Sequence, residues 1–410
     1  LKMRTYNLQN FMDFPNLALR LAMTQPFSCR SLPTHRPNAA MRLFFVLGAG
    51  NLLYQNIGML IYLLGSQQQK HQDEQIEFVL QLSETGAIMG LTMVAACKML
   101  MLFWHGDSIA QLIDAFQRIF PSEKVQRTQA AVKKPIGYYP VQHYALKSHK
   151  LMKMTTIFFI FAFCWYNAMP VLELIIDLNS PVKRFRFHYQ SNTWYPWQTE
   201  HNNESIALYL VAYLCQLHSS LSGVAFIMAG EFMLCFFITQ MQLHFDFLSD
   251  ALESLDAGGA QAEQQLKYLI DYHNMLLRFS SRINQIFNIS FLVNFVTSTI
   301  AICLMGCSMV MITDTFNTFK FSVGLLAFLV FTLFICYNGS ELTSSDKIMH
   351  AAFYNNWYEG SLSYRKMIIF FIMRSVRPCV LRAHKFTDVS MQAYMVVGQA
   401  AFVAMEMNTA

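Results

Sequence analysis

Charged side chains are scarce in this sequence. Asp, Glu, Lys and Arg make up 13% of the 410 residues, against about 25% in an average soluble domain. Hydrophobic residues make up 54% and include 36 Phe and 26 Met. With a formal net charge of only +5, a nucleic-acid partner would have to bind local basic clusters, and the aromatic-rich apolar stretches around them argue against such a partner. The composition is typical of an integral membrane protein.

Patterns for disulfides, metal sites and catalysis are also lacking. None of the nine cysteines falls in a segment assigned below to the outside of the cell, so we expect no extracellular disulfide. Cys303 and Cys307 share a helix face, but no His or acid stands beside them, which favours packing over metal binding. No arrangement of nucleophile, base and acid is present, so we expect neither an enzyme nor a cofactor.

Long apolar runs are abundant. A bilayer core about 30 Å thick needs about 20 apolar residues in a helix, and seven stretches satisfy this requirement. The sequence therefore predicts an all-α membrane protein with seven transmembrane helices. The predicted spans are Leu43–Leu64, Ile76–Phe103, Leu151–Ile176, Ile206–Thr239, Ile286–Ile312, Phe319–Tyr337 and Val389–Met407.

The distribution of Lys and Arg orients these spans, because cytoplasmic segments carry an excess of both. With the N-terminus inside, 21 of the 30 Lys and Arg fall in cytoplasmic segments and 4 in outer segments. We therefore expect the N-terminus in the cytoplasm and the C-terminus outside. The cytoplasmic segments are then 1–41, 104–150, 241–281 and 339–388.

Several helices are predicted to project into the cytoplasm. The fourth span has 34 residues, about 50 Å at roughly 1.5 Å per residue, and its helical pattern continues past Thr239. Between the sixth and seventh spans, the apolar run Met367–Met373 is too short to cross, and Pro378 ends its helix. We expect this run to form a packed helix outside the bilayer. For Phe11–Met23, an interfacial helix and an ordered loop both remain open.

The C-terminal part of the chain carries a specific pattern. Trp357, Arg365-Lys366, Arg377-Pro378 and the short final span Val389–Met407 follow one another in order. With the seven-span architecture, this pattern resembles the insect odorant receptors, ligand-gated cation channels with a cytoplasmic N-terminus. The final span reads GQAAFVAMEM where that family often has a Tyr-Ser or Thr-Tyr pair. Residue roles in the pore are therefore not transferred from the family.

The resemblance implies a tetramer in which an odorant-specific subunit works with a shared co-receptor subunit, in the dendrites of olfactory sensory neurons. The segment between spans four and five lacks the long insertion of the co-receptor, so this chain resembles the odorant-specific kind. The ligand would be a volatile odorant or pheromone. The implied organisation is a cytoplasmic segment at 1–41, a ligand-binding bundle at 42–240, cytoplasmic extensions with an anchor domain at 241–388, and a pore-lining helix at 389–410.

The resemblance places the ligand pocket among the outer halves of spans two, three, four and six. Small apolar ligands need an enclosed aromatic pocket with few polar groups. Because the chain has 36 Phe, part of any aromatic list will be lipid-facing or core. The candidate ligand-binding residues are Phe78 and Leu82 in the second span, Phe163, Trp165, Tyr166 and Met169 in the third, Tyr209 and Tyr213 in the fourth, and Phe321 and Leu325 in the sixth.

The final span is rich in small residues, which permit close helix approach. Counted back in helical steps, Met407, Val403, Gln399 and Val396 share one face. We expect this face to line the pore, with Met407 and Val403 forming a hydrophobic constriction that gates by dewetting. Glu406, near the outer mouth, would favour cations.

Two ionisable residues stand deep in predicted spans, where a charge is costly and indicates a paired or hydrated site. Glu84 fits either a role in the pocket or gate, or a hydrogen-bonded structural acid. His218, beside Ser219 and Ser220, is better explained as a hydrogen bonder between helices. Other ionisable residues in or near spans are Glu77, Lys98, Lys153, Glu173, Glu231 and Lys320.

Three other classes of protein share part of this pattern. A G-protein-coupled receptor also has seven spans, but it needs the opposite orientation, and the cysteine pair that joins the outer end of span three to the next loop is missing from this sequence. A secondary transporter normally shows internal repeats, and these unequal spans show none. A gustatory receptor channel has the same fold and gating, and only the C-terminal pattern favours the odorant branch.

Overall fold

The computed structural model describes residues 5–27, 39–66, 75–126, 138–179, 188–197, 205–311, 315–345 and 347–406. Helices dominate, and the strands β1 (Arg382–Ala383) and β2 (Thr387–Asp388) pair antiparallel. Within the described residues, six helices are long and apolar enough to cross a membrane. They are α3 (Ala39–Ser66), α4 (Gln75–Trp104), α7 (Val141–Asn179), α8 (Ile206–Ser254), α9 (Ala262–Met311) and α10 (Thr315–Ser345).

The seventh membrane helix is α13 (Met391–Glu406), which packs on α9 and α10. It begins later than the predicted Val389, because the Val389 N–H donates to the Leu381 carbonyl oxygen at 2.8 Å and extends the β1–β2 hairpin. The Ser390 hydroxyl then accepts a hydrogen bond from the Ala393 N–H at 3.3 Å. Ser390 therefore acts as the N-cap residue of α13.

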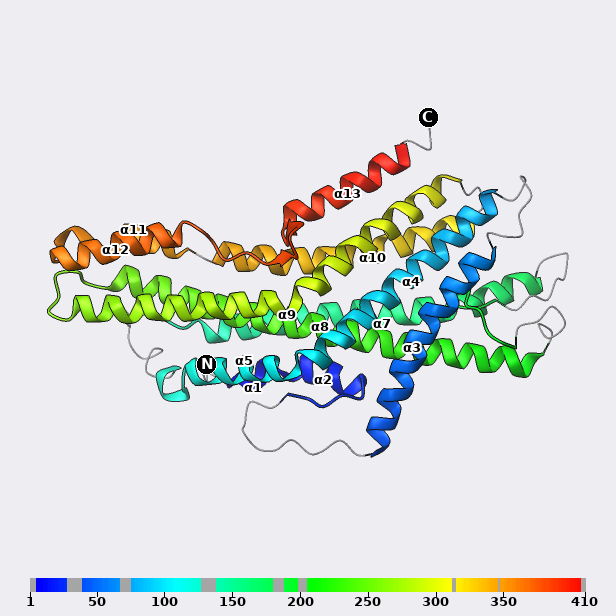
Figure 1. Ribbon diagram of the computed structural model, residues 1–410, viewed down its shortest axis with the longest axis horizontal. Coiled ribbons are helices and arrows are strands. Elements are labelled where there is room, and N and C mark those ends of the chain that lie inside the picture. The colour runs from blue at the N-terminus through cyan, green and yellow to red at the C-terminus, as the bar shows by residue number, and fades with distance from the viewer. Residues whose placement is uncertain are drawn as a thin grey trace.

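Helices α8 and α9 lie side by side in the left part of Figure 1 and diverge toward its right. They contain 49 and 50 residues, about 75 Å each at roughly 1.5 Å per residue. Both exceed the bilayer core of about 30 Å and continue into the cytoplasm, which confirms the predicted projection. In Figure 1 their cytoplasmic ends meet α11 and α12 at the left, while α13 diverges from the bundle toward the upper right.

Asn355 joins the cytoplasmic tip to the end of α8. The Asn355 side-chain amide donates to the carbonyl oxygens of Leu252 at 2.8 Å and Leu255 at 2.7 Å, which satisfies the end of α8. The Tyr364 hydroxyl donates to Asn355 Oδ1 at 3.0 Å. The predicted helix around Met367–Met373 is confirmed as a helix outside the membrane spans. The elements of the tip are α11 (Ile348–Tyr354), the 3-10 turn η2 (Trp357–Glu359) and α12 (Leu362–Ser375).

The N-terminal segment is helical, which decides between the two alternatives left open for Phe11–Met23. The side chain of Asn16 and the backbone of Phe27 exchange two hydrogen bonds of 3.0 Å, which close the segment on itself. The second helix of this segment, α2, packs against α8, and the amphipathic helix α5 lies on the same side of the molecule in Figure 1. The helices on this side are α1 (Leu8–Phe11), α2 (Asp13–Leu21) and α5 (Gly106–Ile119).

Candidate functional site

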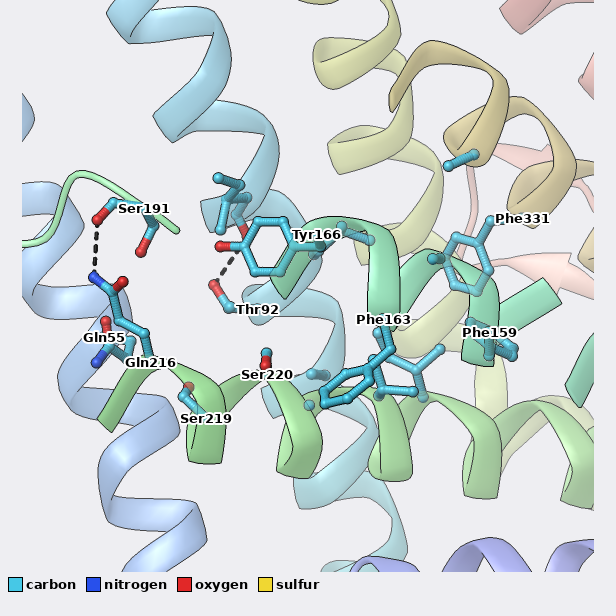
Figure 2. Close-up of a pocket in the computed structure, with 18 of the residues that line it drawn as sticks. Gln55, Thr92, Phe159, Phe163, Tyr166, Ser191, Gln216, Ser219, Ser220 and Phe331 are labelled. Carbon is cyan, nitrogen blue, oxygen red and sulfur yellow. Dashed lines mark hydrogen bonds between the residues drawn. The ribbon is translucent and has the colours of Figure 1, made fainter. Parts of the chain in front are cut away.

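A cavity of about 140 Å³ lies in the middle of the bundle, between α3, α4, α7, α8 and α10. Its wall is largely apolar, and Figure 2 shows Phe159, Phe163 and Phe331 on one side of it. An apolar cavity of roughly 150 Å³ in an engineered protein is known to bind benzene. The space is therefore enough for one small ring.

The polar groups of the cavity gather at its outer end. Thr92 of α4, Ser219 and Ser220 of α8, and Ser191 of the outer segment 188–197 all line it. The Gln216 side-chain amide donates to the Ser191 carbonyl oxygen at 2.9 Å, as the dashed line in Figure 2 marks. These few polar groups give the cavity one wetter end and one apolar end.

The outer segment 188–197 closes the bundle above the cavity. Gln190, Thr193 and Tyr195 are buried within it. The Gln190 amide donates to Asn167 Oδ1 of α7 at 2.7 Å, and the Thr193 hydroxyl donates to Gln55 Oε1 of α3 at 3.0 Å. Because its buried groups bond to α3, α7 and α8, the segment forms a fixed cover.

A second cavity of about 100 Å³ lies between this cover, α4, α7 and α10. Tyr166 and Ile88 line both cavities, so they form the partition between the two. Lys320 Nζ lies 2.6 Å from carboxylate oxygens of both Glu84 and Glu173 in its wall. The outer cavity is therefore charged where the deep one is apolar.

His188 links the cover to this charged wall. Its ring nitrogens lie 3.3 Å from Glu173 Oε2 and 2.8 Å from Asp177 Oδ2. The hydrogen bond to Glu173 is the largest cause that raises the pKa of His188 above its ordinary value. The side chains of Glu84, Lys320, Glu173 and His188 thus join α4, α10, α7 and the outer segment in one chain of ionic contacts.

Tyr209 and Tyr213 of the fourth span hydrogen-bond to the cover and to α7, respectively. The Tyr209 hydroxyl donates to the His188 carbonyl oxygen at 3.0 Å, and the Tyr213 hydroxyl donates to the Asn167 carbonyl oxygen at 2.8 Å. Tyr209 therefore bonds α8 to the cover, and Tyr213 bonds α8 to α7.

Some of the candidate ligand-binding residues predicted from the sequence line one of the two cavities, and others line neither. For Phe78 the structure describes the backbone in α4 but not the side chain. Phe163 and Tyr166 line the deep cavity, and Trp165, Tyr166, Met169 and Phe321 line the outer one. The candidates outside both cavities are Leu82, Tyr209, Tyr213 and Leu325.

The two deep ionisable residues have specific partners. Glu84 belongs to the outer ion cluster described above and lines the outer cavity. His218 Nδ1 lies 3.3 Å from the side-chain nitrogen of Asn51 on α3. This contact agrees with the prediction that His218 bonds between helices. Among the described residues, no group of three or more His, Cys, Asp or Glu has the arrangement of a metal site.

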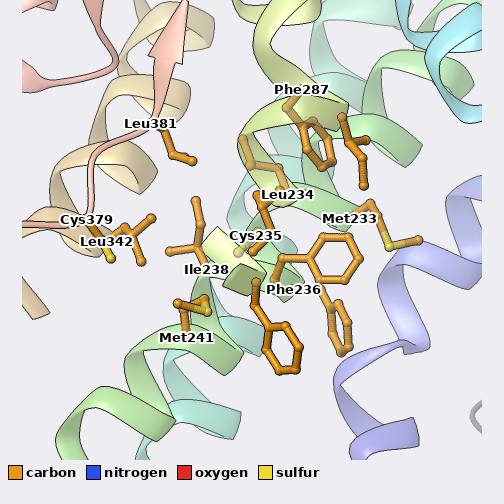
Figure 3. Packing of buried hydrophobic residues seen from close by; sticks show 14 of the residues in the cluster. Met233, Leu234, Cys235, Phe236, Ile238, Met241, Phe287, Leu342, Cys379 and Leu381 are labelled. Carbon is orange, nitrogen blue, oxygen red and sulfur yellow. The ribbon is translucent and has the colours of Figure 1, made fainter. Parts of the chain in front are cut away.

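On the cytoplasmic side of the deep cavity, α8 is buried on every side. Figure 3 shows Met233–Met241 surrounded by Phe287 of α9, Leu342 of α10, and Cys379 and Leu381 from the chain after α12. A helix that is hydrophobic all round belongs in a core. This packing joins the cavity floor to the cytoplasmic part and to the segment that leads into α13.

The final helix has one packed face and one open face. Val397 is 7% exposed, whereas Val396 is 64% and Val403 51% exposed. Gln399 and Glu406 are exposed as well. Met407 lies outside the described residues. The predicted pore face is therefore, over its described part, the face that this chain leaves uncovered.

Sequence reasoning missed the polar end of the deep cavity. Gln216, Ser219 and Ser220 recur at helical spacing within the otherwise apolar α8, which was the available signal. Gln55 also lines the cavity, but its role depends on the outer segment folding back across α3. That return is a long-range contact that no local pattern encodes.

These features define a class of protein: a multi-pass helical membrane protein with a small, largely apolar cavity beneath a hydrogen-bonded outer cover. The model of the 7tm odorant receptor family matches residues 79–402. The chain is 35% identical over 396 residues to the putative odorant receptor 69a, isoform B, of Drosophila melanogaster, covering 95% of both chains. It is 25% identical over 375 residues to the putative odorant receptor 92a of the same species, covering 87% of this chain and 84% of that one.

A solved structure has the same fold. The insect olfactory receptor OR5 from Machilis hrabei in complex with eugenol aligns with a TM-score of 0.73 at 14% identity, covering 98% of each chain. A second structure of the same receptor aligns with a TM-score of 0.71 at 13% identity, covering 98% of this chain and 97% of that one. The chain belongs to the insect odorant receptor family. The resemblance in the C-terminal pattern is thereby confirmed.

Proposed function

We propose that this chain is the odorant-specific subunit of an odorant-gated, non-selective cation channel, and that the deep cavity binds the odorant. The observation that carries the proposal is the largely apolar, aromatic-lined cavity of about 140 Å³ in a chain of this family. Aromatic and aliphatic walls with a few polar groups suit small volatile molecules. In this site Phe163 and Tyr166 contact the ligand directly. Trp165, Met169 and Phe321 shape the outer cavity, which Tyr166 separates from the deep one.

The candidates Tyr209, Tyr213 and Leu325 line neither cavity, so in this proposal they influence the ligand without contacting it. Tyr209 fixes the outer segment over the cavity by a hydrogen bond to the His188 carbonyl oxygen, and Tyr213 joins α8 to α7 by a hydrogen bond to the Asn167 carbonyl oxygen. Leu325 packs against the main apolar cluster from α10. Changes at these residues should alter ligand response through the shape of the site.

The cavity is tested by filling it. Ala162 lines the cavity on α7, so Ala162→Phe places a ring where the ligand would lie. The control is Ile160→Phe, on the outer face of the same helix, where the side chain is 56% exposed. Currents recorded from cells that express each variant with the co-receptor, across a panel of volatiles, should be lost only in Ala162→Phe. Equal responses at equal surface expression would disprove the assignment of the cavity.

The pore is proposed to be lined by α13. Val396, Gln399 and Val403 point away from the packed face of that helix, and Glu406 lies near its outer end, where an acid favours cations. In a central pore made by several subunits, this face would meet permeating ions. Val403→Cys should make the current sensitive to a charged thiol reagent, while Val397→Cys, at a position 7% exposed, should not.

The partner is proposed to be the shared co-receptor subunit, in a heterotetramer in the dendritic membrane of olfactory sensory neurons. Support comes from α12 and the residue that follows it, where Phe370 is 70%, Met373 64% and Val376 59% exposed. Large apolar side chains that cluster in contact with cytoplasm indicate a protein interface. Co-precipitation of tagged chain and co-receptor tests this partnership.

A further inference from the structure

One hydroxyl in the deep cavity has no hydrogen-bond partner among the described residues. Ser219 Oγ is buried, with the residue 3% exposed, and it lines the cavity. A serine inside a helix usually donates to the carbonyl oxygen one turn earlier, which here belongs to Cys215. That oxygen already accepts a hydrogen bond from the Asn51 side-chain amide at 2.7 Å. The acceptor four residues before Ser219 is therefore already occupied by Asn51.

The other serine and threonine hydroxyls of the described cavity wall are satisfied. Ser220 Oγ donates to Asn167 Oδ1 at 3.1 Å, and Thr92 Oγ1 donates to Asn56 Oδ1 at 2.9 Å. Ser191 Oγ lies 2.9 Å from Thr193 Oγ1. Ser219 thus differs from its neighbours, including the adjacent Ser220, in offering an unused hydroxyl to whatever occupies the cavity.

We propose that Ser219 recognises the single polar group of the ligand, and that the ligand is a ring-sized volatile bearing one carbonyl or hydroxyl oxygen. The inference rests on the proposed function, because it takes the deep cavity as the odorant site. A buried hydroxyl without a partner is costly, and a ligand oxygen removes that cost. A site built to bond an oxygen discriminates against the analogue that lacks it.

The cavity also limits the ligand in two further ways. Its volume of about 140 Å³ suits one ring with a short substituent, as the comparison with the benzene-binding cavity indicates. A second carbonyl oxygen on the ligand would find the hydroxyl protons of Ser220 and Thr92 already donated, and burying an unpaired polar group is unfavourable. Ligands with one acceptor oxygen should therefore be preferred over diketones and over hydrocarbons of the same shape.

The test uses ligand pairs that differ only where oxygen is replaced by CH₂: acetophenone with α-methylstyrene, and cyclohexanone with methylenecyclohexane. Concentration–response curves are recorded from cells that express the chain with the co-receptor. The wild type should respond to the ketones at roughly three- to tenfold lower concentration than to the alkenes, the effect of one net hydrogen bond. In Ser219→Ala the ketone curve should shift to that of the alkene, while the alkene curve stays in place.

Ser220→Ala is the matched control, because its hydroxyl already has partners in Asn167 and Leu217, and it should keep the wild-type ratio. The unchanged alkene response reports that Ser219→Ala folds and assembles. A wild-type ratio in Ser219→Ala would overturn the assignment, and so would a wild-type channel that answers none of these ketones. If Ala162→Phe abolishes every response while the Ser219→Ala ratio is unchanged, Ser219 alone is wrong. If Ala162→Phe responds like the wild type, the cavity is wrong as the odorant site.

Discussion

Lys98 of α4 and Glu231 of α8 form an ion pair in the dry centre of the bundle. Lys98 Nζ lies 2.8 Å from Glu231 Oε1, and the side chains are 1% and 0% exposed. Nζ also lies 3.3 Å from Ser290 Oγ on α9. Gly230 makes room for the lysine, since a Cβ there would lie 2.8 Å from Lys98 Cδ. One lysine thus ties three membrane helices together.

The first prediction is that removing either charge destabilises the protein. Lys98→Met leaves the Glu231 carboxylate buried without a counter-charge, which should cost about 3–5 kcal/mol. The double variant Lys98→Met with Glu231→Leu should recover most of that loss, because a well-packed apolar pair has no charge to desolvate. Thermal unfolding of the purified protein and surface expression are the measurements.

The control for this prediction is a second ion pair of the same residue types. Lys147 and Glu341 pair in the cytoplasmic part, where their side chains are 33% and 26% exposed. Partial exposure to solvent weakens such a pair, so Lys147→Met should cost about 1 kcal/mol or less. Lys98→Met with wild-type stability, or a double variant no better than the single, would contradict the role given to the buried pair.

The Lys98–Glu231 pair also shows what the sequence could predict and what it could not. Hydropathy identified the spans that contain both residues, because a membrane helix needs only length and apolar composition. Their pairing depends on how far α4 and α8 are shifted along each other. Sequence reasoning gave more weight to Glu84 and His218, whose depth is apparent in a single span. Which charges meet across helices is set by the assembled bundle.

For the candidate pocket residues too, the sequence predicted which side chains share a helix face but not what that face contacts. The spacing of Tyr209 and Tyr213 correctly indicates one shared face, and their rings lie 6.2 Å apart. Which neighbour that face meets could not be predicted, because the outer segment around His188 returns over it. Phe163 and Tyr166 line the deep cavity because α7 turns that side toward α4 and α8. Residue type and period predict a face, and tertiary contacts decide its use.

The second prediction concerns pH and His188. The pKa of His188 is raised from its ordinary value of 6.5, chiefly by the hydrogen bond to Glu173. A group whose pKa is higher in the folded state stabilises that state fully below its unfolded pKa, about 6.5. This stabilisation is lost as pH rises through the folded pKa. The melting temperature of the wild type should therefore exceed that of His188→Gln most below pH 6.5 or so, and the difference should shrink as pH rises.

A difference between these proteins that grows toward alkaline pH would contradict this sign. Asp177→Asn provides a second variant, because Asp177 Oδ2 lies 2.8 Å from His188 Nε2. It should reduce the pH dependence without removing it, since the contact with Glu173 remains. Loss of the entire effect in Asp177→Asn would assign the stabilisation to Asp177 instead.

The third prediction concerns the junction between α10 and the final helix. A Cβ at Gly339 would collide with the carbonyl oxygen of Val389, a backbone atom that cannot turn aside. Gly339→Ala should therefore displace the start of α13 and reduce the maximal ligand-evoked current, while the half-maximal concentration changes little. Overpacking of this kind typically costs about 1–3 kcal/mol. Gly398→Ala, on α13 with nothing within 4 Å of its Cβ position, is the control; equal maximal currents in the two variants would refute the prediction.

The last prediction separates folding from assembly on α12. Ile368 is 0% exposed, whereas its neighbour Ile369 is 48% exposed. Ile369→Asp should leave the single chain folded, because the carboxylate reaches solvent there. If that face is buried against another subunit, the same carboxylate loses its water without gaining a partner, which is strongly unfavourable.

Ile369→Asp should therefore be made at the wild-type level yet fail to co-precipitate with the co-receptor and carry no current. Ile368→Asp should instead lower the amount of the chain itself, because its carboxylate is buried within the fold. Protein level, co-precipitation and current, measured together for both variants, distinguish a folding defect from an assembly defect. An Ile369→Asp chain that assembles normally and only changes its ligand preference would show that this face of α12 lies outside the subunit interface.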